Sequence, residues 1–287
     1  LEREADRIGF QLLHESGYDV HAMSAFFERL QKANRLIEGN APAYLRTHPM
    51  SVERMSDMQN RAQSLPYKQV PESLDFHLIR AKLRSDLGTS RDAVANARDQ
   101  LNSKRYASEA GARYYLVSSL IRDNQFAAAE RELALLRALK VDNAGIELLA
   151  ARLASAQGNH PAAKEILLAA RNRHIGSWPV HVSLVQSMQD MGAHRDALIE
   201  LSNMIKDRPR DARLYAMQAK SYAATGQQAR MHQALAEQYI LMGTLPGAME
   251  QLQFAQRSGD GDFYLYSAID ARMREIKAEM GAQAKLR

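Results

Sequence analysis

The stretch "AQGNHPAAKEILLAA" (residues 156–170) recurs along the chain and decides the fold. Related stretches are "RDNQFAAAERELALL" (122–136), "DMGAHRDALIELSNM" (190–204) and "ATGQQARMHQALAEQ" (224–238). Each holds a turn residue between two apolar helical patterns, and these turn residues follow one another at intervals of 34 residues: Asn124, Gly158, Gly192 and Gly226. Equal spacing over four copies predicts an array of helix–turn–helix units.

A small residue five positions after each turn supports the array, since two helices approach closely there. It is Ala129, Ala163 and Ala197 in three copies, and Met231 in the fourth. An earlier, irregular copy has Gly88 in the turn. Thirty-four residues is the period of the tetratricopeptide repeat, whose units stack into a solenoid. The sequence therefore predicts an all-α fold with such a solenoid in its larger part.

The first part of the chain reads as three further helices. In the first, Leu1, Ala5, Ile8 and Leu12 follow the spacing of a buried apolar stripe, and a stop is expected at Ser16–Gly17. The later stretch "LPYKQVPES" (65–73) carries two prolines and interrupts the helical pattern. We therefore expect an N-terminal domain over residues 1–68 and a repeat domain over residues 69–287.

Composition removes several classes of function. The chain has 287 residues and a formal net charge of +5, without a Lys/Arg run or interleaved aromatics, so no nucleic-acid surface is expected. It has no cysteine, which excludes disulfides and thiol chemistry. No run approaches the ~20 apolar residues that span a bilayer, so no transmembrane segment is expected in this chain.

A motif opens the chain: "EREADRIG" (2–9) fits E-x-E-A-D-x-x-G. Acids at a helix start usually form a solvated face that suits the helix dipole. This pattern, however, resembles the third-ligand motif of the HtpX-like and CAAX-prenyl-protease-like zinc metallopeptidases. The stretches "GYDVHAMSAFFERL" (17–30) and "THPMSVER" (47–54) also resemble the periplasmic, repeat-tailed branch of that family.

The resemblance implies roles for two carboxylates. Glu2 would be a Zn²⁺ ligand, and Asp6 would accept a hydrogen bond from the far nitrogen of a ligand His. In the family an upstream H-E-x-x-H helix supplies two His ligands and the general base. No H-E-x-x-H occurs in this chain, and "HESGY" (14–18) fails the pattern, so His14 is expected on the helix surface. We therefore expect no catalytic residue in this chain, which alone should be inactive.

Two residues of "THPMSVER" have open roles. His48 either makes a capping or packing contact, or lies on a loop over the zinc cleft, where it would contact metal or substrate as a gate. Arg54 is expected to hydrogen-bond a carboxylate or the carbonyls of the same loop, with a structural role.

The resemblance further implies a periplasmic zinc metalloendopeptidase of a Gram-negative bacterium. Such proteins associate with the outer-membrane β-barrel assembly machinery and degrade stalled or misfolded outer-membrane proteins. The repeat groove would hold a partner or an unfolded substrate. The alternative is a non-catalytic adaptor, in which the repeats bind protein partners and the N-terminal helices are a degenerate remnant.

Overall fold

The computed structural model describes residues 2–35, 52–68 and 70–285. These residues form fifteen α-helices and no β-strand, which confirms the predicted all-α class. Two compact units are present, Leu1–Ser73 and Leu74–Arg287, while the domain boundary between residues 68 and 69 stays a prediction. Within the described ranges, no helix has both the length and the apolar character needed to cross a membrane.

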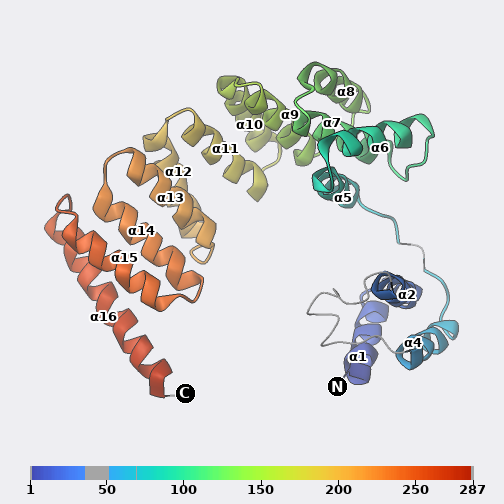
Figure 1. The fold of residues 1–287 in the computed structure, drawn as a ribbon, viewed down its shortest axis with the longest axis horizontal. Coiled ribbons are helices and arrows are strands. Elements are labelled where there is room, and N and C mark those ends of the chain that lie inside the picture. The colour runs from blue at the N-terminus through green and yellow to red at the C-terminus, as the bar shows by residue number, and fades with distance from the viewer. Residues whose placement is uncertain (1, 36–51, 69, 286–287) are drawn as a thin grey trace. The chain divides into compact units, whose positions relative to one another are not determined.

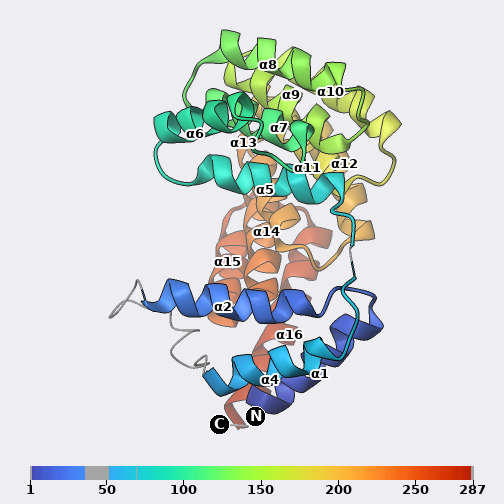
Figure 2. The same ribbon diagram turned by 90° about the vertical axis from the view of Figure 1, so that its right-hand side faces the viewer.

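The N-terminal unit is a group of three helices, α1 (Glu2–Glu15), α2 (His21–Arg35) and α4 (Val52–Gln63) (Figure 2). Helix α4 packs against both α1 and α2. A small apolar core lies between them, formed by Phe10, Val20, Phe27, Met58 and Ala62.

The apolar stripe predicted on the first helix is wrong. Leu1 lies outside the described residues, whereas Ala5, Ile8 and Leu12 are exposed, Ile8 by 45% and Leu12 by 57%. The buried residues of α1 are instead Asp6 and Phe10. Periodicity arguments place an acid on the solvent side. That assumption fails here because a cation from another helix accompanies the carboxylate into the core.

The C-terminal unit is a succession of helices in which each packs mainly on its neighbours along the chain, as Figure 1 shows. The exception is at its start, where α5 packs more extensively on α7 than on α6. The twelve helices are α5 (Leu74–Asp86), α6 (Ser90–Asn102), α7 (Glu109–Arg122), α8 (Phe126–Ala138), α9 (Ala144–Ala156), α10 (His160–Arg173), α11 (Trp178–Asp190), α12 (His194–Asp207), α13 (Ala212–Ala224), α14 (Gln228–Leu241), α15 (Leu245–Arg257) and α16 (Phe263–Lys285).

The predicted turn residues end the first helix of each pair. Asn124, Gly158, Gly192 and Gly226 have φ angles of 57°, 78°, 75° and 77°, in the left-handed region. At Gly192 the amide donates to the Gln189 carbonyl, and the next amide donates to the Met188 carbonyl. This pair of bonds is the Schellman motif, which satisfies the last carbonyls of a helix and reverses the chain.

The small residues lie where the paired helices approach, as predicted. Ala129, Ala163 and Ala197 each have 0% of their surface exposed. In the fourth copy Met231 is only partly buried, and Ala229, two positions earlier, is 1% exposed. In α14 the buried side of the helix is therefore turned relative to the earlier repeats, and the position of Met231 no longer requires a small residue. The repeats form a tetratricopeptide-type solenoid.

Candidate functional site

The two carboxylates of the opening motif lie one turn apart on α1. Four residues of α-helix advance about 6 Å, so Glu2 and Asp6 project from the same side. They differ in environment: 36% of the Glu2 side chain is exposed, against 6% of the Asp6 side chain. Asp6 therefore belongs to the interior of the unit, and Glu2 borders solvent.

One guanidinium from α4 holds both acids. The Nε and Nη2 atoms of Arg54 donate to the two carboxylate oxygens of Asp6 at 2.6 and 2.7 Å. Its Nη1 lies 3.1 Å from Oε2 of Glu2. The guanidinium also stands 5.7 Å from the centre of the Phe27 ring on α2. Arginine suits this place because its planar fork matches a carboxylate with two parallel hydrogen bonds.

The positions of Glu2 and Asp6 can be compared with the requirements of a zinc site. A carboxylate is an accepted zinc ligand, because one of its oxygens can bind a metal while the other accepts hydrogen bonds. Asp6 is held in place with both oxygens on Arg54. Glu2 thus fits as one ligand. Across the part of the chain that the structure describes, no group of three His, Asp or Glu residues could hold a metal ion. The other ligands of a zinc site would have to come from elsewhere.

His14 is not a second ligand of this site. It is exposed in the last turn of α1, about 18 Å along the axis from Glu2 at 1.5 Å per residue. The helix ends at Glu15, and Gly17 adopts a φ of 83°, so the helix that an H-E-x-x-H pair requires does not continue past His14. This agrees with the surface position expected for His14. His48 lies outside the described residues.

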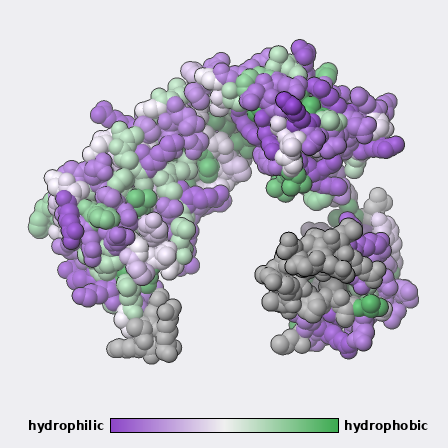
Figure 3. All heavy atoms as spheres, viewed as in Figure 1, coloured by the Kyte–Doolittle hydropathy of each residue, from purple (hydrophilic) through white to green (hydrophobic). Residues whose placement is uncertain are grey.

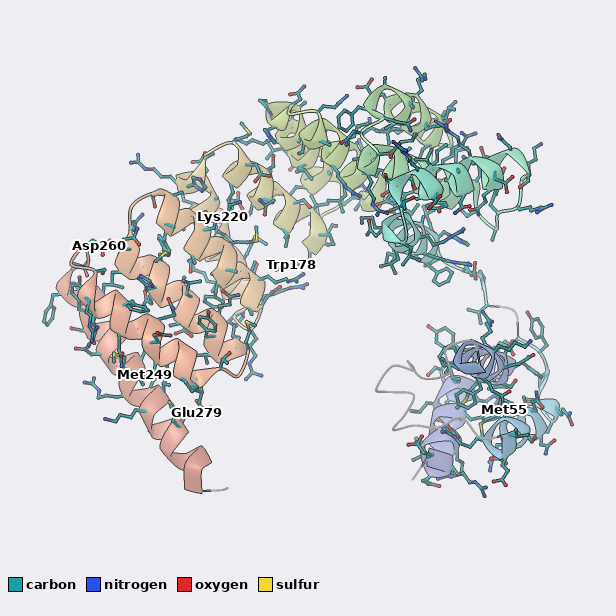
Figure 4. All side chains as sticks on the ribbon, in the orientation of Figure 1. Met55, Trp178, Lys220, Met249, Asp260 and Glu279 are labelled. Carbon is teal, nitrogen blue, oxygen red and sulfur yellow. The ribbon has the colours of Figure 1, made fainter. Side chains whose placement is uncertain are left out.

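The sequence did not reveal that Arg54 pairs with Asp6. It offered a carboxylate or loop carbonyls as partners for Arg54, and the structure shows the carboxylate. A signal was present, because Arg54 precedes Met58 by one turn and lies on the buried side of α4. The adjacent Met55, labelled in Figure 4, is partly buried against the same core. An arginine on an apolar helix face requires an acid partner, and the only buried acid of this unit's described residues is Asp6.

Residues 1–62 match the model of peptidase family M48. This match confirms the resemblance to a peptidase family, and the matched range contains α1, α2 and all but the last residue of α4.

Curated relatives resemble most of the chain or a part of it. It is 27% identical over 279 residues to the beta-barrel assembly-enhancing protease of Escherichia coli K12, covering 96% of this chain and 56% of that protein. The protein of the same name in Yersinia pestis is 31% identical over 114 residues, 39% of this chain and 23% of its own length. The chain thus spans about half the length of the Escherichia coli protein.

A solved structure of a tetratricopeptide repeat protein from Parabacteroides merdae is also similar. It covers 96% of this chain and 99% of its own, at 12% identity and a TM-score of 0.44.

Proposed function

We propose that residues 1–287 form the C-terminal part of a zinc metalloendopeptidase that acts on outer-membrane β-barrel proteins. The observation that carries this proposal is the match of residues 1–62 to peptidase family M48, with the Glu2 carboxylate partly exposed beside a buried Asp6–Arg54 pair. The similarity to beta-barrel assembly-enhancing proteases over 96% of the chain supports the substrate class.

The residues have distinct tasks in this proposal. Glu2 would bind the zinc ion through one oxygen, with two His ligands from an H-E-x-x-H segment that these 287 residues do not contain. When bound, the zinc would polarise the peptide carbonyl and lower the pKa of a water. Arg54 holds the Glu2 and Asp6 carboxylates in position. Asp6 would in turn accept from the outer nitrogen of a ligand His. His48 would act as a gate on a loop at the cleft.

The solenoid would supply binding. Stacked helix pairs form extended surfaces for peptides and partner proteins. The outer-membrane β-barrel assembly machinery and unfolded barrel proteins are the proposed ligands, and the periplasm is the proposed compartment, both by analogy with the relatives.

The experiment uses the full-length protein encoded by the parent gene. Zinc content by mass spectrometry and cleavage of an unfolded β-barrel protein are measured for the wild type and for Glu2→Gln and Asp6→Asn. We expect Glu2→Gln to lose zinc and activity. Asp6→Asn should weaken zinc binding by at least about 10–100-fold, because it removes the carboxylate acceptor and also breaks the buried pair with Arg54, so Glu2→Gln carries the test of ligation. Glu4→Gln is the matched control, because Glu4 is exposed on the same turn and pairs with Arg7 of its own helix.

Two results would contradict the proposal. If the parent gene encodes no H-E-x-x-H, the chain is an adaptor and not a peptidase part. If Glu2→Gln retains zinc to the same extent as Glu4→Gln, Glu2 is not a ligand. Unchanged zinc affinity and activity in His48→Ala would remove the gate alone.

A further inference from the structure

The first helix of the solenoid exposes a row of large apolar side chains. Ile79, Leu83 and Leu87 follow one another at intervals of four residues along α5 and just past its end, with exposed fractions of 61%, 63% and 70%. The opposite side of the helix is buried. Figure 3 shows hydrophobic residues gathered over α5. The outer face of a terminal repeat is normally polar, and contiguous exposed apolar side chains mark interaction sites.

A row of arginines runs beside the apolar row. Arg80 and Arg84 each follow one of the exposed apolar residues, so both rows run along α5 with the same spacing. Together with Arg105 they line a cleft of about 740 Å³ between α5, α6 and the start of α7. Among the residues that the structure describes, none of these three arginines forms an ion pair, and Asp99 is the one acid lining the cleft.

One of these arginines is already held in place. The guanidinium of Arg84 lies 4.7 Å from the centre of the Tyr115 ring, and its Nη1 donates to the Gln100 side-chain oxygen at 3.1 Å. Tyr115 is 4% exposed, so the ring is a fixed support. A cation held by a ring and an amide keeps its charge for an anion, because neither partner neutralises it.

We propose that this face of α5 binds an α-helical segment of a partner protein, with an apolar row flanked on one side by carboxylates. Rows at intervals of four residues are the ridges through which two helices pack. The apolar row of the ligand would cover Ile79, Leu83 and Leu87. Its carboxylates would meet Arg80 and Arg84 at the mouth of the cleft. Ridges at this spacing suit a helix as the ligand, and the arginine row suits an acidic flank on that helix.

A second copy of this chain fits the face less well. If two α5 helices packed antiparallel about a two-fold axis, equivalent flanks would face each other across the seam. The arginine row of one copy would then oppose the arginine row of the other. Like charges in that arrangement repel, whereas an acidic flank attracts. Charge complementarity therefore selects a different chain.

The test uses a fluorescein-labelled amphipathic peptide of 18 residues with leucines on one face and glutamates on one flank. Its matched partner carries lysines in place of the glutamates. Fluorescence anisotropy with residues 1–287 should show the glutamate peptide binding at least about fivefold more tightly. Leu83→Ser should weaken this binding by about tenfold, and Arg80→Gln with Arg84→Gln should remove the preference for glutamate. Neither zinc nor proteolysis enters the measurement, so its result is independent of the proposed peptidase function.

Helix α12 offers matched controls. Ile199 is 65% exposed and Arg195 precedes it by four residues on the same helix, so Ile199→Ser and Arg195→Gln repeat both changes elsewhere. These variants should bind as the wild type does. Equal affinity for the two peptides, or equal losses in Leu83→Ser and Ile199→Ser, would overturn the proposal. So would a dimer in sedimentation velocity that Leu83→Ser converts to monomer, because the second copy would then be the occupant.

Discussion

Breaking the pair between Asp6 and Arg54 should destabilise the N-terminal unit specifically. Both side chains are almost fully buried, and two charge-assisted hydrogen bonds of 2.6 and 2.7 Å join them. A hydrogen bond to a charged group contributes about 1.5–3 kcal/mol, so two give about 3–6 kcal/mol. Removing one partner of a buried ion pair costs about 3–5 kcal/mol, since the other charge is left uncompensated. The change Asp6→Asn should therefore cost at least ~3 kcal/mol.

This cost is large for so small a unit. Domains of about 60 residues bury little surface and have a small stability reserve. We expect Asp6→Asn to bring the unit close to its unfolding midpoint while the solenoid stays folded. Hydrogen exchange followed by mass spectrometry resolves the two, because it reports each helix separately. Peptides from α1 and α4 should lose protection, and peptides from α9 to α12 should not.

Exposed charges on the same two helices provide the control. Arg3 of α1 and Glu53 of α4 form an ion pair with side chains 70% and 75% exposed. Arg3→Gln should leave exchange unchanged, because solvent screens such a pair. Replacing both buried partners, in Asp6→Leu with Arg54→Met, should restore much of the protection. The reasoning is refuted if Asp6→Asn exchanges as slowly as Arg3→Gln in α1 and α4.

Three further predictions concern the solenoid. Gly192→Ala should cost about 1–2 kcal/mol in urea unfolding followed by Trp178 fluorescence, because its φ of 75° is left-handed; Gly281→Ala, in the open surface of α16, should not destabilise. Ala197→Leu should cost about 1–3 kcal/mol by overpacking a fully buried position, and an unchanged midpoint would contradict the close helix approach. Asp260 (Figure 4) accepts from the Ala229 amide at 2.9 Å; burial raises its pKa, but hydrogen bonds led by that amide outweigh burial and keep the pKa below its ordinary value. The ionised Asp260 carboxylate should therefore stabilise the fold above about pH 4, and this stabilisation should be lost as pH falls through the lowered pKa. The difference in unfolding free energy between wild type and Asp260→Asn should be constant above about pH 5 and shrink below about pH 4.

The solenoid was predictable because its signals are local. The geometry of a single helix pair requires both a left-handed turn residue and an alanine at a fixed distance after it. Gly158 and Gly192 take the left-handed conformation that glycine adopts without strain, and Ala163 and Ala197 fill fully buried places where the paired helices approach. Repetition of the same pair of signals then fixed the architecture.

The N-terminal unit was less predictable because its core depends on a contact across 48 residues. The apolar stripe of the first helix suggested Ile8 and Leu12 as buried, yet Asp6 takes the inner place with Arg54. No spacing rule within one helix reveals this, since a carboxylate is buried only if a cation from another element arrives with it. The same applies to α5, whose exposed apolar row is visible only once the buried side of that helix is known.

The two groups of arginines in this chain illustrate what an arginine does in each surrounding. Arg54 is buried and forms ion pairs with two carboxylates of its own unit, and these ion pairs hold α1 against α4. Arg80, Arg84 and Arg105 line a cleft with a single acid and form no ion pair within the described residues. Loss of charge at Arg54 should therefore appear as loss of stability, whereas loss of charge at Arg84 should appear as loss of ligand preference. That division separates a structural arginine from a binding one.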